Sequence, residues 1–373
     1  MSWRLYTGRG LSTGIAILII VIVALAAFAG ILGYGSEVAT TRTPAWVPPS
    51  TSTKSNASPL ILYSADAYVA ESSALESAFT NRTGIQTVPP KAGGSLLLGQ
   101  QIAQGDPVSV FLSVSRSAVS SAVLKDEFPG WAVAFATDEM ALAYSNASAR
   151  ISYGAVSSVI DSYQAARASN TTGAWFAFFS NLTSGKVKVG ISNPNADPAG
   201  FRAWLVLQAA GALYAGNDSS YFVNRMLQNN GNVSAASAAD LVAPLQAGQI
   251  QFVFIYRSAV IAQHLGLILL NDGINLGDPS HDAFYATFAY ATSSGLERGG
   301  TILLYLSVPN DSTNYEGALE FVTFVARSGA QTLSQFGLST LAPARLYNDT
   351  PTSVPPALTQ LAAQGELEYS GAL

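Results

Sequence analysis

The sequence predicts an α/β fold of two lobes, and three observations carry this prediction. From residue 60 onward, short apolar runs alternate with amphipathic stretches, which is typical of strands that alternate with helices. Three loops each follow an expected strand and open an expected helix, as loops do at the carboxyl edge of a parallel sheet. The length of 373 residues is too great for one small domain and suits two lobes of ordinary size.

The first half of this region predicts a strand, two helices, a second strand and a long extended segment. Residues 60–63 and 108–112 are apolar runs of strand length. Residues 69–80 place their apolar side chains at helical spacing, and a second helix is expected over 96–104. Residues 131–144 form an apolar stretch that predicts one long extended segment.

The second half repeats the alternation. Strands are expected over 186–191, 251–256 and 301–308, where apolar residues cluster in short runs. Helices are expected over 201–214 and 316–328, and the second of these is strongly periodic.

Composition excludes several classes of protein. The chain has no cysteine, which excludes disulfides, thiol catalysis, cysteine-bound metals and a lipid-modified cysteine, and it has only two histidines. Its 18 basic residues are fewer than its 23 acidic ones and form no run, so a nucleic-acid partner is not expected. An apolar fraction of 49% rules out disorder over most of the chain.

The N-terminal segment, residues 1–35, is predicted to enter a membrane. Residues 10–36 carry no charge, and 15–32 form an almost unbroken apolar run. About 20 such residues span a bilayer as a helix. Because Arg4 and Arg9 precede the run, the N-terminus should stay in the cytoplasm and the remainder should lie outside.

A cleaved signal peptide is the alternative to a retained anchor. Ala27-Phe28-Ala29 fits a signal-peptidase site, but apolar residues continue through Tyr34, which favours the retained anchor. Residues 36–58 are rich in Pro, Ser and Thr, and this composition predicts a semi-extended linker that holds the following domain away from the membrane.

Glycosylation sequons support the outside location. Nine asparagines begin an N-x-S/T sequence, whereas the Asn, Ser and Thr content predicts about three by chance. N-linked glycans are therefore expected, and glycosylation without cysteine is typical of an archaeal surface protein. The nine are Asn56, Asn81, Asn146, Asn170, Asn181, Asn217, Asn232, Asn310 and Asn348.

The first of the three strand-to-helix loops has the composition of an anion site. Gly93-Gly94-Ser95 precedes the 96–104 helix, so backbone N–H groups and the Ser95 hydroxyl would meet at a helix N-terminus. The same residues also suit an ordinary turn and N-cap. In 192–202, SNPNADPAGFR, Asp197 precedes Pro198 in the order favoured at a helix start. This turn would place a carboxylate and backbone donors at a cleft.

The third loop, 254–258, ends a strand with Tyr256 and Arg257, whose hydroxyl and guanidinium could reach the same cleft. The three loops, together with 253–264 (VFIYRSAVIAQH), Asn275-Leu276-Gly277, 131–144 and the late helix 318–328, resemble archaeal-type molybdate/tungstate-binding proteins. These are solute-binding components of oxyanion ABC importers. The resemblance covers nearly all of residues 59–345.

The resemblance implies a periplasmic-binding-protein fold of the second type, with crossing strands that act as a hinge. One lobe would hold 59–138 and 300–373, and the other 139–299. The family positions that line the oxyanion correspond here to Ser95, Asp197, Ala199 and Tyr256, with Ser113 nearby. Neither a cofactor nor a resident metal is implied. The implied partners are an ABC permease and the oxyanion, tungstate or molybdate first, and the chain is expected to be a monomer.

Two positions depart from the family pattern. Ala65-Asp66 replaces a pair of small residues that ends in serine, and Ile255 replaces a glutamate that ligates the metal centre in archaeal members. A carboxylate beside a dianion is repulsive unless it bonds to the metal centre. Asp66 is therefore a candidate ligand-binding residue whose role is open, since it could also hold a cation or a sugar hydroxyl.

Three other functions are alternatives to oxyanion binding. A binding protein for an organic solute, such as a sugar or peptide, would use the same fold, and a structural surface-layer protein would share the anchor and the glycans. An enzyme is not expected, because the sequence has no GxSxG or HExxH motif and its two histidines have no evident partners.

The expected ectodomain is poor in charge. Beyond residue 58 it holds 14 basic and 22 acidic residues, a net charge of −8. A surface with few carboxylates loses little stability when they protonate, so the composition predicts tolerance of an acidic exterior.

Overall fold

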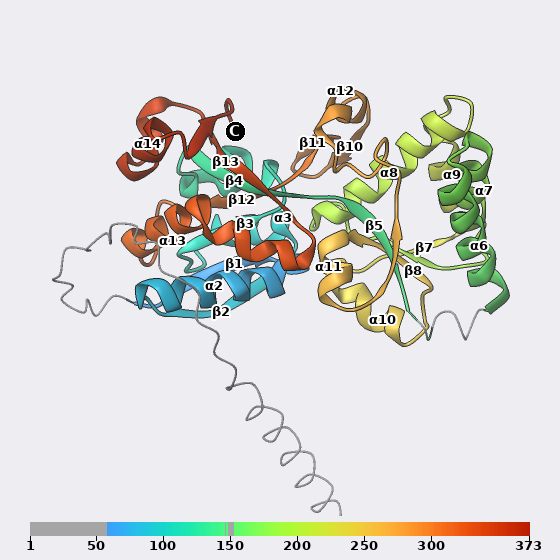
Figure 1. Cartoon of the computed structure of the whole chain (residues 1–373), viewed down its shortest axis with the longest axis horizontal. Helices are drawn as coiled ribbons and strands as arrows, with labels where there is room; N and C mark the ends of the chain where they lie inside the picture. Colours follow the sequence, from blue (N-terminus) through green and yellow to red (C-terminus); the bar gives the residue numbers. More distant parts are fainter. Residues whose placement is uncertain (1–57, 146, 148–152) are drawn as a thin grey trace, which may run out of the picture. The chain divides into compact units, whose positions relative to one another are not determined.

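The computed structural model describes residues 58–145, 147 and 153–373. The predicted membrane segment 1–35 and all but residue 58 of the predicted linker lie outside these residues. Within the described residues, no helix has both the length and the apolar character needed to cross a bilayer. The described chain builds two separate sheets, seen side by side in Figure 1, and one additional β-hairpin.

The first lobe is built on a seven-stranded sheet in the order β14-β13-β4-β12-β3-β1-β2. Strands β1, β2 and β3 are parallel, while β12 is antiparallel to both β3 and β4. The strands are β1 (Leu60–Ala65), β2 (Thr87–Gly93), β3 (Val110–Ser113), β4 (Trp131–Asp138), β12 (Ile302–Ser307), β13 (Ser339–Asn348) and β14 (Leu367–Tyr369). Its α-helices are α2 (Val69–Thr83), α3 (Ser95–Ile102), α4 (Ser121–Leu124), α13 (Tyr315–Arg327) and α14 (Pro356–Ala363).

The second lobe is built on a five-stranded sheet in the order β7-β6-β8-β5-β9. Its strands are β5 (Met140–Tyr144), β6 (Val189–Gly190), β7 (Asn232–Val233), β8 (Phe252–Tyr256) and β9 (Gly266–Leu269). The helices that accompany it are α6 (Tyr153–Ser169), α7 (Thr172–Leu182), α8 (Pro198–Tyr214), α9 (Tyr221–Gln228), α10 (Val242–Gln246) and α11 (Arg257–Ala262). Helix α12 (Asp282–Tyr285) precedes the hairpin of β10 (Ala289–Thr292) and β11 (Gly295–Arg298).

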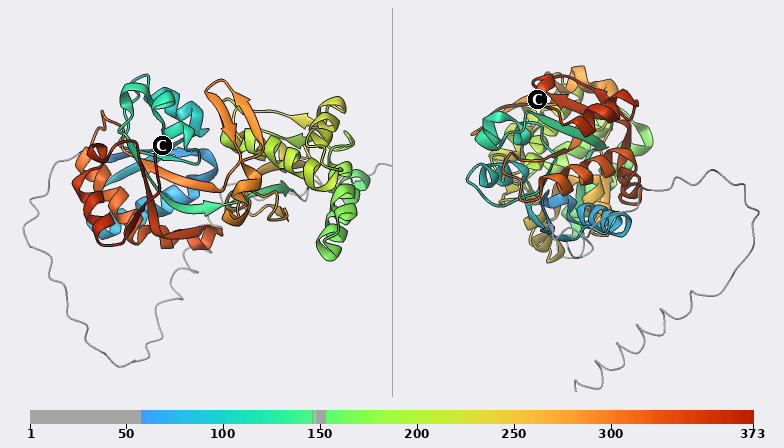
Figure 2. Two further views of the ribbon diagram at one scale, coloured as in Figure 1. Left: turned by 90° about the horizontal axis from the view of Figure 1, so that it is seen from above. Right: turned by 90° about the vertical axis from the view of Figure 1, so that its left-hand side faces the viewer.

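Two connections join the lobes. Strand β4 ends at Asp138 and β5 begins at Met140, so one extended segment leaves the first sheet and enters the second. The chain returns between Arg298 and Ile302. Figure 2 shows both crossings between the lobes. In each sheet three parallel strands lie beside one antiparallel strand that has just crossed, which is the arrangement expected of a two-lobed binding protein. The predicted lobe limits, 59–138 with 300–373 and 139–299, remain predictions.

The core follows the apolar runs of the sequence. Strands β3 and β12 are buried along their whole length, because helices cover both faces of a sheet with parallel strands. In the second lobe, Trp175, Phe178 and Phe179 of α7 pack against one another at ring distances of 4.9 to 6.5 Å. Burial of each large side chain stabilises the fold by about 1.5–3 kcal/mol.

Several expected elements have different limits in the structure. The extended segment 131–144 is two strands, because Glu139 accepts from Arg257 N and Met140 donates to Asn275 O, outside the first sheet's ladder. The strand expected over 186–191 pairs only at Val189–Gly190. The helix expected over 96–104 runs from Ser95 to Ile102 and is followed by a turn that closes at Gly105, whose φ of 93° is left-handed.

Candidate functional site

Three parallel strands of the first lobe end at one edge of their sheet. Strand β1 pairs with both β2 and β3, and Ala65 lies opposite Gly93. Loops that leave parallel strands at the carboxyl edge are the usual place for ligands in α/β folds. This edge carries three residues singled out from the sequence, namely Asp66, Ser95 and Ser113.

The two serines make different hydrogen bonds. Ser95 is fully buried at the first position of α3, and its Oγ accepts from Val114 N at 3.2 Å. Ser113 Oγ accepts from Ser115 N at 3.0 Å and donates to Ser115 O at 2.9 Å. The Ser113 hydroxyl therefore closes its own turn, whereas the hydrogen of the Ser95 hydroxyl remains a donor for an acceptor at this edge.

On the second lobe, Asp197 caps the N-terminus of α8. Its Oδ1 accepts from Ala199 N at 3.1 Å and its Oδ2 accepts from Ala238 N at 2.8 Å. Pro198 follows at the first helical position, as the Asp-Pro order predicts. The Ala199 N–H group, expected to face the ligand, is thus engaged by Asp197 in this structure.

Tyr256 and Arg202 link the two lobes. Tyr256 ends β8, and its hydroxyl accepts from Arg202 Nη1 at 2.7 Å. Arg202 Nη2 donates across the interface to Val114 O at 2.6 Å. Arg257, expected at the same place, lies elsewhere, because it pairs with Glu139 at 3.3 Å between Nη1 and Oε1.

The lobes are closed on each other around these residues. Leu97 N, in the first turn of α3, donates to Ala196 O of the other lobe at 3.2 Å. A Cβ on Gly94 would lie 2.3 Å from the same carbonyl oxygen. Only glycine allows the two backbones to approach this closely. The N-terminus of α3 therefore contacts the loop that opens α8.

The carboxyl groups at this interface hold their protons more tightly than usual. Burial, and then the nearby charge of Asp197, raise the pKa of Asp66 to about 7. Burial also raises the pKa of Asp197, against the effect of its two backbone donors. Among the described residues, neither Asp66 Oδ2 nor Ser192 Oγ makes a hydrogen bond of good geometry, although the hydroxyls of Ser237 and Ser192 lie close enough to Asp66 and Asp197 to lower the pKa of each in part. Buried polar atoms left unpaired in this way are suited to a ligand.

A buried network at the first crossing was missed in the sequence. Asp138, the last residue of β4, accepts from Tyr68 Oη at 3.0 Å and from Ser258 Oγ at 2.6 Å, both through Oδ2. Burial raises the pKa of Asp138 to about 6 despite these bonds. The Tyr68 ring packs on that of Tyr256 at 5.3 Å. An acidic residue inside the apolar stretch 131–144 was the available signal.

No carboxylate replaces the family glutamate at position 255. Ile255 is fully buried in β8 and belongs to the hydrophobic core. Across the ranges that the structure describes, no group of three or more His, Cys, Asp or Glu side chains is arranged to hold a metal ion. The two acidic residues singled out from the sequence, Asp66 and Asp197, come one from each lobe.

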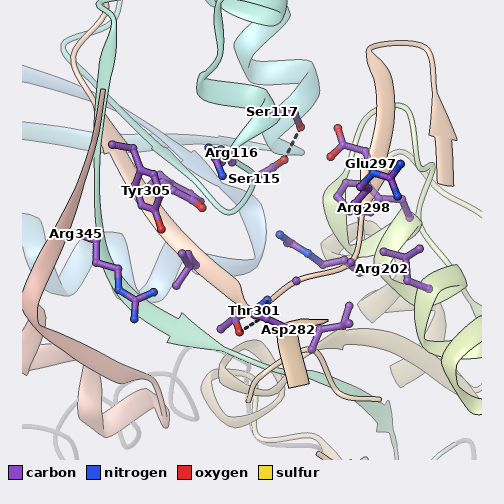
Figure 3. Close-up of a pocket in the computed structure, with 17 residues that line it drawn as sticks. Ser115, Arg116, Ser117, Arg202, Asp282, Glu297, Arg298, Thr301, Tyr305 and Arg345 are labelled. Carbon is purple, nitrogen blue, oxygen red and sulfur yellow. Dashed lines mark hydrogen bonds between the residues drawn. The ribbon is translucent and has the colours of Figure 1, made fainter. Parts of the chain in front are cut away.

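A cavity of about 310 Å³ lies beside this cluster between the lobes (Figure 3). None of the six residues predicted from the sequence lines it. It adjoins them through Ser115, which is bonded to Ser113, and Arg202, which is bonded to Tyr256. The structure therefore holds a closed cluster of predicted residues and, next to it, an open cavity that the sequence did not predict.

Comparisons with known proteins agree with this architecture. Residues 60–339 match the family model described as bacterial extracellular solute-binding protein. A solute-binding protein of Sulfurisphaera tokodaii is 38% identical over 325 residues, covering 85% of this chain and 84% of that protein. One of Saccharolobus solfataricus is 35% identical over 319 residues, covering 84% and 78%.

Two solved structures show the same fold. The periplasmic molybdate-binding protein of Azotobacter vinelandii has a TM-score of 0.52 at 14% identity, covering 75% of this chain and 98% of its own. The sulfate-binding protein of Mycobacterium tuberculosis has a TM-score of 0.50 at 14% identity, covering 85% and 94%. The expected two-lobed fold is thereby confirmed. The chain belongs to the family of bacterial extracellular solute-binding proteins, which are transport components and not enzymes.

Proposed function

We propose that this chain delivers an oxyanion to an ABC permease and that it binds tungstate or molybdate between its lobes. The observation that carries the proposal is the closed interface at which the N-termini of α3 and α8 meet the hydroxyls of Ser95 and Tyr256. The shared fold with a molybdate-binding protein supports the same class of ligand.

Binding needs no covalent step. The N-terminus of a helix of ordinary length carries about half a positive charge and unpaired N–H groups, which attract an anion. Hydroxyl donors complete the shell that replaces water, and lobe closure then excludes solvent. Because the predicted ectodomain has a net charge of −8, it repels anions at long range. Capture therefore rests on the local donors.

Asp66 contributes to this site as a protonated acid. Ionised, it would repel a dianion beside it. With a pKa of about 7 it is largely protonated in mildly acidic solution, and its O–H group is then a donor. The unpaired Oδ2 atom is the position from which such a bond would be made.

Ser95→Ala is expected to weaken tungstate binding at least tenfold, because it removes a buried donor to a charged ligand. Such a bond contributes about 1.5–3 kcal/mol. Calorimetry with tungstate, molybdate and sulfate measures the effect, and the Tm of the unliganded variant reports the cost of leaving Val114 N unpaired. Ser77→Ala, at an exposed hydroxyl on α2, is the control. Absence of heat from all three anions with the unaltered protein would refute the proposal.

Tungstate affinity is expected to fall about tenfold between pH 6 and pH 8, as Asp66 loses the proton that the complex requires. Asp66→Asn keeps a donor and cannot ionise, so its affinity should be nearly constant over this range. Titrations at three pH values test this. Equal pH profiles for the two proteins would show that Asp66 does not face the anion.

An organic solute is the second candidate, and the unpaired Oδ2 atom of Asp66 favours it. As a carboxylate, that atom would accept from a sugar hydroxyl or hold a cationic group. A thermal-shift panel of sugars, amino acids and peptides separates the two functions. A stabilising neutral or cationic solute whose effect is lost in Asp66→Ala would support the second.

The cellular setting is part of the proposal. Residues 1–35 tether the protein as a membrane anchor, 36–58 form the linker, and the chain acts as a glycosylated monomer on the cell surface. Asn81 and Asn217 are exposed and are the best glycan acceptors. Asn181 and Asn310 are less suitable, because their Nδ2 groups donate to backbone carbonyls.

A further inference from the structure

Positively charged side chains gather around the cavity beside the cluster, although the protein as a whole is acidic. Nine arginines lie in the described part of the chain, and four of them line this cavity. Only two acidic residues, Asp282 and Glu297, line it as well, so positive charge is in excess by two. The whole chain carries −5. The four are Arg116, Arg202, Arg298 and Arg345.

These arginines do not have acidic partners of their own. The ion pairs found among the described residues use Lys91, Arg257, His281 and Arg327. The arginines of the cavity instead contact neutral groups. Arg116 donates to Ala372 O and lies 5.1 Å from the Tyr347 ring, and Arg298 makes a long bond of 3.5 Å to Ala286 O. Their charge remains available to an anion.

The two lobes contribute to opposite walls. Arg116 follows β3 and Arg345 lies on β13, both in the first lobe, while Arg298 ends the β10–β11 hairpin. That hairpin is bonded to α8 through Gln208 Nε2 and Ala289 O at 3.1 Å. In Figure 3, Arg345 and Arg298 lie on opposite sides of the cavity. Like charges that converge from two lobes repel each other until an anion lies between them.

Size and lining indicate an organic anion. About 310 Å³ is at the lower end of small-molecule pockets and holds about ten water-sized groups. A single tetrahedral oxyanion would leave much of it unfilled. Hydroxyls of Ser117, Thr301 and Tyr305 line the walls between the guanidinium groups. Planar guanidinium groups bind carboxylate and phosphate in bidentate geometry, which fixes an anionic group at each wall.

We propose that this cavity is a second anion site, distinct from the oxyanion cluster, for a small organic acid with two anionic groups. Arg345 binds one group and Arg298 the other, with Arg116 assisting. The ligand therefore spans the lobes and favours their closed arrangement. Two sources share this chemistry, namely dicarboxylic acids and phosphorylated carboxylic acids. This second site is independent of which anion the cluster binds, because only Ser115 and Arg202 connect the cavity with the cluster.

The test is thermal-shift and calorimetric titration of the full-length protein with succinate, phosphoglycolate, uncharged succinamide and tungstate. We expect one or both diacids to bind and succinamide to have no effect. Arg345→Gln and Arg298→Gln should each weaken the diacid at least tenfold and leave tungstate binding unchanged. Arg327→Gln, at an exposed arginine paired with Glu366, is the matched control and should bind as the unaltered protein does.

The outcomes separate this site from the proposed function. If neither the unaltered protein nor any variant binds tungstate while the diacid still binds, only the oxyanion proposal is overturned. Failure of both diacids to bind would overturn the second site, as would diacid affinities that neither variant changes. Equal losses of diacid and tungstate in Arg345→Gln would show that the cavity and the cluster are one site, against this inference.

Discussion

Gly94→Ala is expected to weaken tungstate binding at least 100-fold while the unliganded protein keeps its Tm. The added Cβ would lie 2.3 Å from Ala196 O and 3.0 Å from Asp197 Cα, both backbone atoms of the other lobe. Backbone cannot move aside as a flexible side chain can, so the lobes must stay apart. Separation removes the bond from Leu97 N to Ala196 O and every contact of the second lobe with the ligand. A factor of 100 corresponds to about 2.7 kcal/mol.

The substitution separates closure from folding. Gly94 has φ −61° and ψ 136°, which alanine adopts without strain, so the first lobe should fold normally. Calorimetry gives the affinity, and small-angle X-ray scattering shows whether tungstate still compacts the molecule. Gly173→Ala, where nothing lies within 4 Å of the added carbon, is the control. A variant that binds normally and still compacts would show that the closed contact at Gly94 is not required.

The sequence predicted those parts of the fold whose burial is continuous. Strands β3, β8 and β12 are continuous apolar runs because both of their faces are covered. Helix α13 is periodic because only one of its faces is buried. Strand β13 was not predicted. Its first five residues are mostly exposed and it contains Pro343, so no apolar run marks it. Helices α6 and α7, which pack on each other, were not predicted either. Their stability depends on tertiary packing that no local pattern records.

In the candidate site, too, local features could be predicted from the sequence and long-range contacts could not. The Asp197 cap could be predicted, because Asp-Pro order and the helix it opens are adjacent in sequence. The bridge through Arg202 could not, since its partners Val114 and Tyr256 are 88 and 54 residues away. The arginines of the cavity are spread from position 116 to 345. Only folding brings these arginines together. The sequence around each of them is that of an ordinary surface loop or strand.

The protein is expected to be more stable at pH 5 than at pH 8, with a Tm at least about 5 °C higher. Burial raises the pKa of Glu71 and Glu76 to about 7 and that of Asp138 to about 6. Burial, together with the charge of Asp197, raises the pKa of Asp66 to about 7. In the unfolded chain these groups titrate near 4. Between about pH 4 and pH 7 the native state therefore binds more protons, so the free energy of unfolding falls as pH rises.

The size of the effect follows from the number of groups. One pKa unit corresponds to about 1.4 kcal/mol, so a mean shift of a single unit over four carboxyls already amounts to about 5 kcal/mol. Asp106 and Asp278 act in the opposite direction, because their partners lower their pKa values, but their side chains are 40% and 37% exposed and are screened by solvent. Tolerance of acid, expected from the sparse surface charge, thus has a second source in these buried carboxyls.

Glu71→Gln isolates one of these carboxyls and is expected to raise Tm at pH 8 while changing it little at pH 5. Glu71 is fully buried on α2, and within the described residues neither of its carboxylate oxygens makes a hydrogen bond of good geometry. Ionising it therefore costs desolvation, which the backbone and the nearby Ser258 hydroxyl offset only in part. Glutamine keeps the shape without the charge. Glu320→Gln, at an exposed position of α13, serves as the control. The test is to measure Tm from pH 4 to pH 8 for both proteins. If Tm changes with pH to the same extent in Glu71→Gln and in the unaltered protein, Glu71 holds no extra proton in the native state.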